Sequence, residues 1–266
     1  MEITDPNAIN NKDLIVFDLD GTLAPTKSTI DNEMGKLIEQ LLIHKKVAVI
    51  GGGKLELFQH QFLNELKVPK NLLKNLFLFP VTATTFFRYG NGWEKVYEHD
   101  LSEEEINRIM SAFEKVFKEI NYQIPQKTYG KTIENRGTQV TWSALGQDVV
   151  KILGDKGVEL KTKWKEENTP LKLKIASSLE KYLPDLEVHS AGYTSIDITK
   201  KGIDKAYGLK QMEKYLEVRI EKMLFIGDAI FPGGNDYAIT KTPIDYVAIK
   251  NPEETKEIIR KVLNQA

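Results

Sequence analysis

The chain has 266 residues, of which 41% are hydrophobic and 28% are charged, so it can bury a substantial core and is not intrinsically disordered. Its 37 basic and 38 acidic residues give a net charge of -1, which provides no overall attraction to nucleic acid or to an anionic membrane. Since there is no cysteine, thiolate metal sites, disulfides and cysteine nucleophiles are excluded. The four histidines are scattered along the chain, which disfavours a histidine-rich metal site, so any metal should be bound by oxygen.

The N-terminal residues 1–11 lack the charged start and apolar stretch of a signal peptide. No segment approaches the roughly 20 apolar residues of a membrane span. We therefore expect a cytoplasmic protein that has neither a nucleic-acid nor a membrane partner.

Four short apolar runs predict the strands of a parallel sheet. They are residues 14–17, 47–50, 223–226 and 246–249. The runs are continuous rather than alternating, which is typical of strands buried on both faces. A helix is predicted at 31–43, with Asp31 as its N-cap, and a closing helix is predicted to start at Pro252, because proline is favoured at the first helical position. The two ends of the chain thus predict an α/β core.

The middle of the chain has the pattern of an antiparallel α+β unit. Its predicted strands are residues 84–87, 93–97, 139–142 and 195–198. One helix is predicted at 101–120, where Ser102 and Glu105 form a capping box, and a second is predicted to start at Pro170 and to end near residue 183. We expect this unit, residues 84–199, to be an insertion that divides the core into residues 1–83 and 200–266.

The strongest chemical signal is the hexapeptide Phe-Asp-Leu-Asp-Gly-Thr at 17–22, which follows the first strand. Residues two apart at a strand end point the same way, so Asp18 and Asp20 converge where open α/β sheets bind ligands. Gly21 lets the chain turn away, and Thr22 is placed to hydrogen-bond a carboxylate. A plain strand followed by an Asp-Gly turn would explain Gly21 but not the first aspartate.

This hexapeptide resembles the first motif of the haloacid dehalogenase (HAD) superfamily of phosphotransferases. The resemblance implies that Asp18 is the nucleophile that takes up the phosphoryl group and that Asp20 is the general acid/base. A carboxylate can attack phosphorus only if a cation cancels its repulsion from the phosphate. Mg²⁺ held by oxygen ligands suits this role and the cysteine-free sequence.

A third strand ends in Asp228, which places another carboxylate beside Asp18 at the edge of the sheet. We predict that Asp18, Asp228 and Asp20 bind Mg²⁺, Asp20 through its backbone carbonyl. Asn235 and Asp236, in the Pro-Gly-Gly-Asn-Asp run, are expected to orient the site without binding the metal directly.

Two further features predict phosphate binding. Glycines at 51–53 follow the second strand, and the N–H groups of Gly52 and Gly53 are expected to contact the phosphate, since the hydroxyl usual in the HAD pattern is absent. Lys205 lies at the position of the HAD phosphate-binding lysine, which implies pairing with the phosphoryl oxygens and with Asp18. The alternatives are an ordinary turn for the glycines and a solvated surface side chain for Lys205.

The place of the insertion resembles the type C2 cap of HAD subfamily IIB, which includes Cof-type sugar phosphatases and eukaryotic-type phosphomannomutases. The resemblance implies a Rossmann-like HAD core with an inserted α+β cap. Stretches similar to the mutases occur at 49–53, 133–136, 194–197, 202–205 and 232–236. They imply that the cap residues Arg136, Ser195 and Asp197 hold a sugar phosphate. Ordinary polar strand residues are the alternative.

Three departures from the mutases bear on the reaction. Gln147 stands where the mutases have a phosphate-gripping arginine, and Lys27 replaces another arginine. Both are still expected to contact substrate. Residues 81–83 replace the Glu-Asn-Gly of the first hinge. A mutase must rebind a bisphosphorylated sugar in two orientations and needs a strong distal anion site, so we favour a Mg²⁺-dependent phosphosugar phosphatase that acts through an aspartyl-phosphate.

The alternative enzyme is a phosphomannomutase-type hexose-phosphate mutase, which returns the same phosphoryl group to the sugar. A phospho-aspartate signalling or binding module is disfavoured, because such modules lack the Asp-x-Asp-Gly-Thr motif and a large cap. The expected partner is a small phosphorylated sugar. Relatives similar to the mutases often pair through their caps, so a homodimer is a further expectation.

Overall fold

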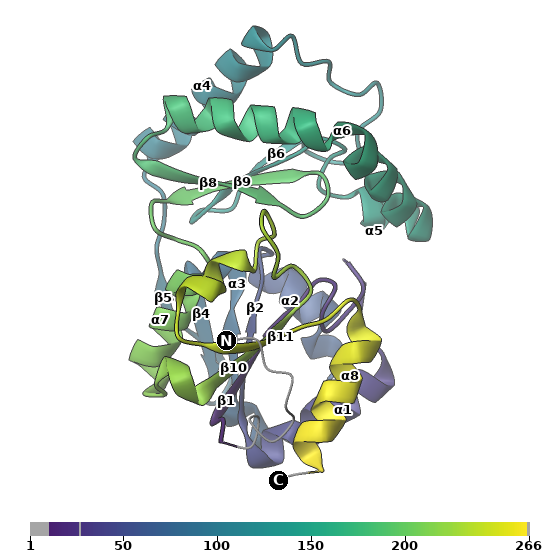
Figure 1. Ribbon diagram of the computed structural model, residues 1–266, viewed down its shortest axis with the longest axis vertical. Helices are drawn as coiled ribbons and strands as arrows, with labels where there is room; N and C mark the ends of the chain where they lie inside the picture. The colour runs from purple at the N-terminus through teal and green to yellow at the C-terminus, as the bar shows by residue number, and fades with distance from the viewer. Residues whose placement is uncertain (1–10, 27, 265–266) are drawn as a thin grey trace. The chain divides into compact units, whose positions relative to one another are not determined.

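The computed structural model describes residues 11–26 and 28–264. The chain forms two compact units (Figure 1). We call them the core unit, which comprises Met1–Glu98 and Asp204–Ala266, and the inserted unit, His99–Ile203.

The core unit is built on a seven-stranded sheet with the order β11-β10-β1-β2-β3-β4-β5. Its strands are β1 (Leu14–Asp18), β2 (Lys46–Ile50), β3 (Leu76–Phe79), β4 (Thr85–Tyr89), β5 (Trp93–Glu98), β10 (Met223–Gly227) and β11 (Asp245–Ala248). The first five strands in this order, β11, β10, β1, β2 and β3, pair in parallel. Strands β4 and β5 are added antiparallel at the other edge. All residues of the central strand β1 are buried, so the α/β prediction from continuous apolar runs is confirmed.

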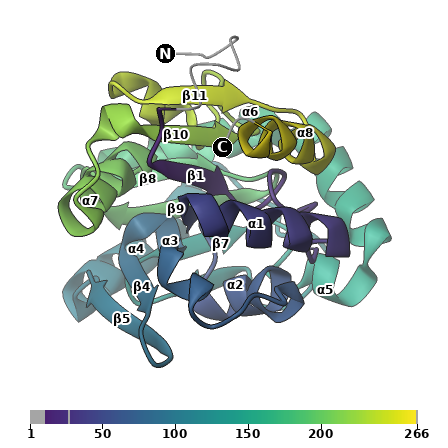
Figure 2. The same ribbon diagram turned by 90° about the horizontal axis from the view of Figure 1, so that it is seen from below.

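Helices cover both faces of this sheet (Figure 2). They are α1 (Asn32–His44), α2 (Leu55–Gln61), α3 (Pro80–Ala83), α7 (Lys205–Leu216) and α8 (Pro252–Leu263), with short 3-10 helices η2 (Leu63–Glu65), η3 (Leu72–Asn75), η4 (Ile220–Lys222) and η5 (Tyr237–Lys241). The predicted N-cap of α1 is present, because the Asp31 carboxylate accepts a hydrogen bond from Met34 N at 2.8 Å. Helix α8 begins at Pro252, as predicted, and Asn251 is its N-cap.

The hairpin of β4 and β5 lies in the core unit, although we expected strands at 84–87 and 93–97 to belong to the insertion. Strand β4 pairs with β3 through Leu78 and Phe87. The rings of Phe79 and Phe86 stack with their centroids 4.4 Å apart, and Phe86 is 2% exposed. The hairpin thus completes the core sheet, and the inserted unit begins at His99 and ends at Ile203 instead of spanning 84–199.

The inserted unit contains a four-stranded antiparallel sheet with the order β6-β7-β9-β8. Its elements are α4 (Glu103–Glu119), β6 (Ile133–Asn135), β7 (Val140–Ser143), α5 (Val149–Leu153), α6 (Asp155–Tyr182), β8 (Leu186–Ala191) and β9 (Ser195–Lys200). Helices α4 and α6 lie on one side of the sheet, where their apolar residues pack with Trp142, Ile196 and Ile198 (Figure 1). The capping box of Ser102 and Glu105 at the start of α4 is confirmed.

Helix α6 corrects a second prediction. We expected a helix to start at Pro170, but Pro170 lies inside a 28-residue helix that begins at Asp155. Proline has no backbone N–H to donate to the preceding turn. Side chains just before Pro170 bond to other carbonyls of that turn: Thr169 Oγ1 donates to Lys165 O at 2.6 Å and Asn168 Nδ2 donates to Trp164 O at 3.1 Å.

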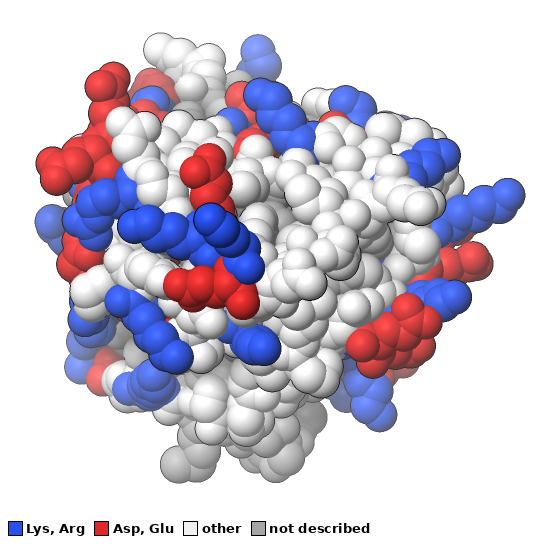
Figure 3. All heavy atoms as spheres, turned by 90° about the horizontal axis from the view of Figure 1, so that it is seen from above, with Lys and Arg blue, Asp and Glu red and all other residues white. Residues whose placement is uncertain are grey.

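Acidic and basic side chains are interspersed on the face shown in Figure 3, in keeping with the net charge of -1. Among the helices of the described residues, none is both long and apolar enough to cross a membrane.

Candidate active site

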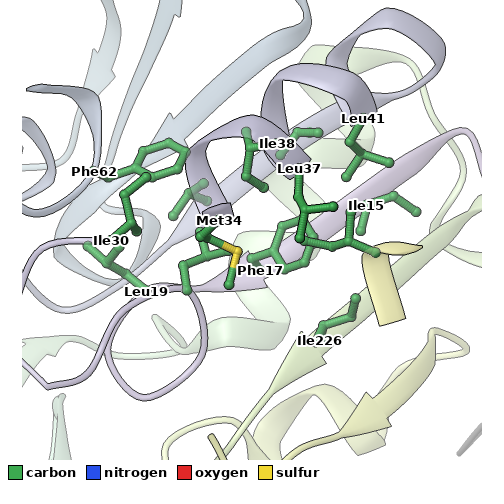
Figure 4. Close-up of a cluster of buried hydrophobic side chains, with 14 of the residues drawn as sticks. Ile15, Phe17, Leu19, Ile30, Met34, Leu37, Ile38, Leu41, Phe62 and Ile226 are labelled. Atoms are coloured by element: carbon green, nitrogen blue, oxygen red, sulfur yellow. The ribbon is translucent and has the colours of Figure 1, made fainter. Parts of the chain in front are cut away.

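The site is organised by β1, which ends at Asp18. Ile15 and Phe17 point into a buried cluster with Met34 and Ile38 of α1 (Figure 4). Leu14 and Val16 pack on the opposite face of the sheet. Because both faces of β1 are covered by apolar side chains, the end of the strand is held firmly at the carboxyl edge of the sheet.

Three carboxylates converge at this edge. Oxygen atoms of Asp18, Asp228 and Asp236 lie within 4.8 Å of one another. Gly21 makes the approach of two loops possible: its φ is +86°, and a Cβ atom there would lie 2.5 Å from Asp228 Oδ2. Among the described side chains, the third converging carboxylate is that of Asp236, which we expected to orient the site without binding the metal directly. The expected contribution of Asp20 is its backbone carbonyl, which a cluster of side-chain oxygens does not test.

Burial and mutual repulsion make this cluster electrostatically unfavourable without a cation. Burial, opposed by Lys205 and reinforced by Asp236 and Asp228, raises the pKa of Asp18 well above its usual value. Burial and then Asp236 raise the pKa of Asp228 to about 6. A group of hard carboxylate oxygens at such short range fits Mg²⁺ and does not fit a soft metal.

Lys205, the first residue of α7, supplies the positive charge within the cluster. Its Nζ donates to Asp18 Oδ1 at 2.5 Å and also to Asp236 Oδ1. The side chain of Lys205 is 2% exposed, so it is not a solvated surface lysine. The start of α7 is fixed by Asp204, whose carboxylate accepts a hydrogen bond from Tyr207 N at 2.8 Å.

Asp236 is fully buried and ties the loop after β10 to the cluster. Its Oδ2 accepts a hydrogen bond from Ala229 N at 3.1 Å, and its own N–H donates to Ala229 O at 3.3 Å. The neighbouring Asn235, which we expected to orient the site, is exposed. Asp236 therefore organises both the loop and Lys205.

Asp20 and Thr22 lie in the turn after β1. The carboxylate of Asp20 accepts a hydrogen bond from Gln61 Nε2 at 3.1 Å. The Thr22 hydroxyl, which we expected to bond to a carboxylate, is buried and has no partner among the described residues. We did not single out Gln61 from the sequence. The sequence pattern that could have indicated Gln61 is a polar residue three positions after the apolar Phe58, on the side of α2 that is buried.

The glycine loop after β2 is braced by a strained turn. Three consecutive residues of that turn, Val81, Thr82 and Ala83, have φ values of 51°, 55° and 61°. Val81 N donates to Gly53 O and Thr82 N donates to Gly51 O, each at 2.9 Å. Left-handed conformations cost about 1–3 kcal/mol per non-glycine residue, so this segment carries real strain. Its hydrogen bonds hold the carbonyls of the glycine loop in place.

The inserted unit has a polar cluster of its own. Arg136 Nε donates to Glu134 Oε2 at 2.8 Å, and Arg136 Nη2 donates to Gln147 Oε1 at 3.2 Å. Gln147 Nε2 donates to Thr141 O at 3.3 Å, and Thr141 Oγ1 donates to Asp197 Oδ1 at 2.7 Å. The cluster thus joins three of the four predicted cap residues through one strand, β7.

Asp197 is buried within this cluster, and burial raises its pKa despite the opposing effect of Arg136. Ser195, the fourth predicted cap residue, lies two positions before Asp197 on β9 and is half-buried. Lys27, which we also expected to contact substrate, lies outside the residues that the structure describes.

Comparison with known proteins gives consistent matches over nearly the whole chain. The family model for haloacid dehalogenase-like hydrolases matches residues 15–264. A protein of Encephalitozoon cuniculi named phosphomannomutase is 26% identical, with 97% of this chain and 96% of that protein covered. The phosphomannomutase of Saccharomyces cerevisiae is also 26% identical, with 94% of each chain covered. Phosphomannomutase 1 of Homo sapiens is 24% identical, with 94% of this chain and 91% of the relative covered.

Solved structures share the fold at lower identity. An N-terminally truncated, IMP-bound IMP-nucleotidase of Plasmodium falciparum superposes with a TM-score of 0.70 at 17% identity, covering 95% of this chain and 68% of that chain. A trehalose-6-phosphate phosphatase of Aspergillus fumigatus gives a TM-score of 0.58 at 13% identity, covering 99% of both chains.

The preference for a phosphatase over a mutase was wrong. Relatives that align over nearly their full length, from fungi to mammals, are named phosphomannomutase. A single replaced cation does not decide between the two reactions. In the structure Gln147 takes part in orienting Arg136, so the loss of one arginine at position 147 leaves a positioned guanidinium in the same cluster.

Proposed function

We propose that this chain, a member of the haloacid dehalogenase-like hydrolase family, is a Mg²⁺-dependent hexose-phosphate mutase of the phosphomannomutase type. The observation that carries the proposal is the carboxylate group of Asp18, Asp228 and Asp236, in which the buried Asp18 and Asp236 both pair with Lys205. Similarity over almost the entire length of relatives named phosphomannomutase supports the mutase as the specific reaction.

Asp18 is the proposed nucleophile. Lys205 is bonded to Oδ1 of this carboxylate, which leaves Oδ2 as the oxygen that attacks phosphorus. The ammonium group also offers positive charge to the phosphoryl oxygens as the transfer proceeds. Asp18, Asp228 and the backbone carbonyl of Asp20 would hold Mg²⁺, with Asp236 beside them. When bound, the ion supplies charge that offsets the repulsion between the nucleophile and the phosphate.

Asp20 is the proposed general acid/base. It gives a proton to the sugar oxygen that leaves phosphorus and later takes a proton from the hydroxyl that attacks the aspartyl-phosphate. Gly52 and Gly53 would contact the phosphate through their backbone N–H groups. The proposed sugar-phosphate ligands are Arg136, Gln147, Ser195, Asp197 and Lys27. Return of the phosphoryl group to a different hydroxyl of the sugar completes the isomerisation.

The test is conversion of mannose 1-phosphate to mannose 6-phosphate, followed by ³¹P NMR with Mg²⁺ and a hexose bisphosphate activator. We expect isomerisation by the wild type, its loss in Asp18→Asn, and its loss when EDTA removes the metal. Asp13→Asn is the matched control, because Asp13 is an exposed carboxylate at the other end of β1. Release of inorganic phosphate without any isomerisation, or full activity in Asp18→Asn, would contradict the proposal.

A further inference from the structure

Gln61 is a buried amide bonded to the proposed acid/base. It is the last residue of α2 and is 0% exposed. Its Nε2 lies 3.1 Å from Asp20 Oδ1 and 3.1 Å from the backbone oxygen of Ser28. A carbonyl oxygen can only accept, so the Ser28 contact establishes which end of the amide is the nitrogen. The same nitrogen therefore donates to Asp20.

The environment of Gln61 is costly for an amide. Its Oε1 is buried and has no hydrogen-bond partner among the described residues. An unsatisfied buried acceptor is unfavourable, whereas a leucine of similar size would fill the same space without that cost. The main chain of Gln61 is held separately, since its carbonyl accepts a hydrogen bond from Ile30 N at 2.8 Å. The amide side chain is accounted for by the two bonds of Nε2, one that holds the backbone at Ser28 and one that reaches the carboxylate of Asp20.

We propose that Gln61 is a positioning residue that fixes the rotamer of Asp20 and makes Oδ2 the oxygen that exchanges the catalytic proton. This inference rests on the role of Asp20 in the proposed function. In the transfer, Asp18 forms a bond to phosphorus while the bond from phosphorus to the ester oxygen breaks. The leaving oxygen takes the proton from Asp20 Oδ2 and becomes a hydroxyl, and Asp20 becomes a carboxylate. The Gln61 N–H donates to Oδ1 throughout, which stabilises negative charge on that oxygen and makes Oδ2 the favoured site for the proton.

The experiment compares two phosphate esters of similar size, phenyl phosphate and 4-nitrophenyl phosphate, in the first turnover with Mg²⁺. The nitrophenolate needs little help from an acid, whereas the more basic phenolate depends on protonation. In Gln61→Leu we expect phenol release to slow by about 10–100-fold, the usual effect of removing a partner that orients a site residue, and nitrophenolate release to change little. The first turnover reports phosphoryl transfer to Asp18, whatever happens afterwards to the aspartyl-phosphate.

Gln59→Leu is the matched control, because Gln59 is an exposed glutamine on the same helix, and it should leave both rates unchanged. Asp20→Asn should show the same selective loss as Gln61→Leu, but larger. If Gln61→Leu does not fold, Gln61→Asn provides the same test, since its shorter side chain cannot reach both Asp20 and Ser28.

Equal losses for the two esters, or no loss for either, would overturn the role of Gln61. If Asp20→Asn discriminates between the esters and the Gln61 variants do not, only this inference fails. If Asp20→Asn also slows the release of phenol and nitrophenolate equally, Asp20 is not the general acid/base of the proposed function, and the role of Gln61 inferred from it fails as well.

Discussion

Charge balance at the residue scale explains why the site suits a divalent cation. Burial lowers the pKa of Lys205, but Asp18 and Asp236 outweigh this effect and raise it above the usual value, so the ammonium stays charged. Three carboxylates in their metal-binding, ionised form and one ammonium sum to two negative charges, and one oxygen of each carboxylate lies within 4.8 Å of the others. A single Mg²⁺ would neutralise them, and it would restore low pKa values to Asp18 and Asp228.

A second buried lysine, Lys172 of α6, leads to a prediction about pH. Its Nζ donates to Gly192 O at 2.7 Å, and burial followed by repulsion from Lys165 lowers its pKa from 10.5 to about 8. The unfolded chain therefore binds more protons than the folded chain between these values, so the free energy of unfolding should rise as the pH increases from about 8 to about 10.5. Below pH about 8 the full penalty for the buried charge applies.

Urea unfolding of the wild type and Lys172→Met, at about pH 7 and about pH 9.5, measures this effect. We expect the wild type to gain more stability than the variant between the two conditions. Lys174→Met on the same helix is the control, since Lys174 is exposed and should leave the pH dependence of the wild type intact. Identical pH dependence in Lys172→Met and the wild type would show that the charge on Lys172 is not penalised.

At the scale of the element, a substitution at Pro170 tests whether α6 begins at this proline or continues through it. If the helix began at this proline, Pro170→Ala would be neutral or destabilising, because proline suits the first helical position. In the structure the helix continues through Pro170 from Asp155 to Tyr182, so alanine restores a backbone donor and removes a steric clash. We expect Pro170→Ala to increase the free energy of unfolding by about 1–3 kcal/mol, measured by urea denaturation.

Pro252→Ala is the control for this measurement. Pro252 occupies the first turn of α8 after the Asn251 N-cap, where its missing N–H would have no partner in the helix anyway. This variant should be unchanged or slightly less stable. A loss of stability in Pro170→Ala would indicate that residues 155–169 do not form one helix with the segment that follows.

At the scale of the whole molecule, the division into two units predicts which fragment folds. The buried cluster of the inserted unit draws all its members from His99–Ile203. We expect residues 99–203, expressed alone, to unfold cooperatively in thermal circular dichroism. A fragment of residues 84–203 should aggregate, because it carries β4 and β5 without the strand and the Phe79 ring on which they pack. Cooperative folding of only the longer fragment would place the hairpin in the inserted unit.

Local patterns in the sequence were sufficient for much of the core. Continuous apolar runs predicted β1, β2 and β10, because a strand buried on both faces has few polar positions. A similar run predicted β11, but this strand lies at the edge of the sheet and is only partly buried. The caps at Asp31, Ser102 and Asn251 were also predictable, since each side chain bonds to a backbone N–H only three positions away. The same locality placed Asp18 at the end of β1 and Asp20 in the turn that follows it.

Only the tertiary structure decided the partners of residues far apart in the chain. The resemblance implied that Lys205 pairs with Asp18, but the pairing of Lys205 with Asp236 and of Gln61 with Asp20 joins side chains whose approach depends on how strands and loops are assembled. The hairpin of β4 and β5 was placed in the wrong unit for the same reason, because alternation of residues predicts a strand but does not identify the neighbour to which it bonds. Hydrophobic periodicity is a local property, whereas hydrogen-bond partners across a sheet edge are determined by the whole fold.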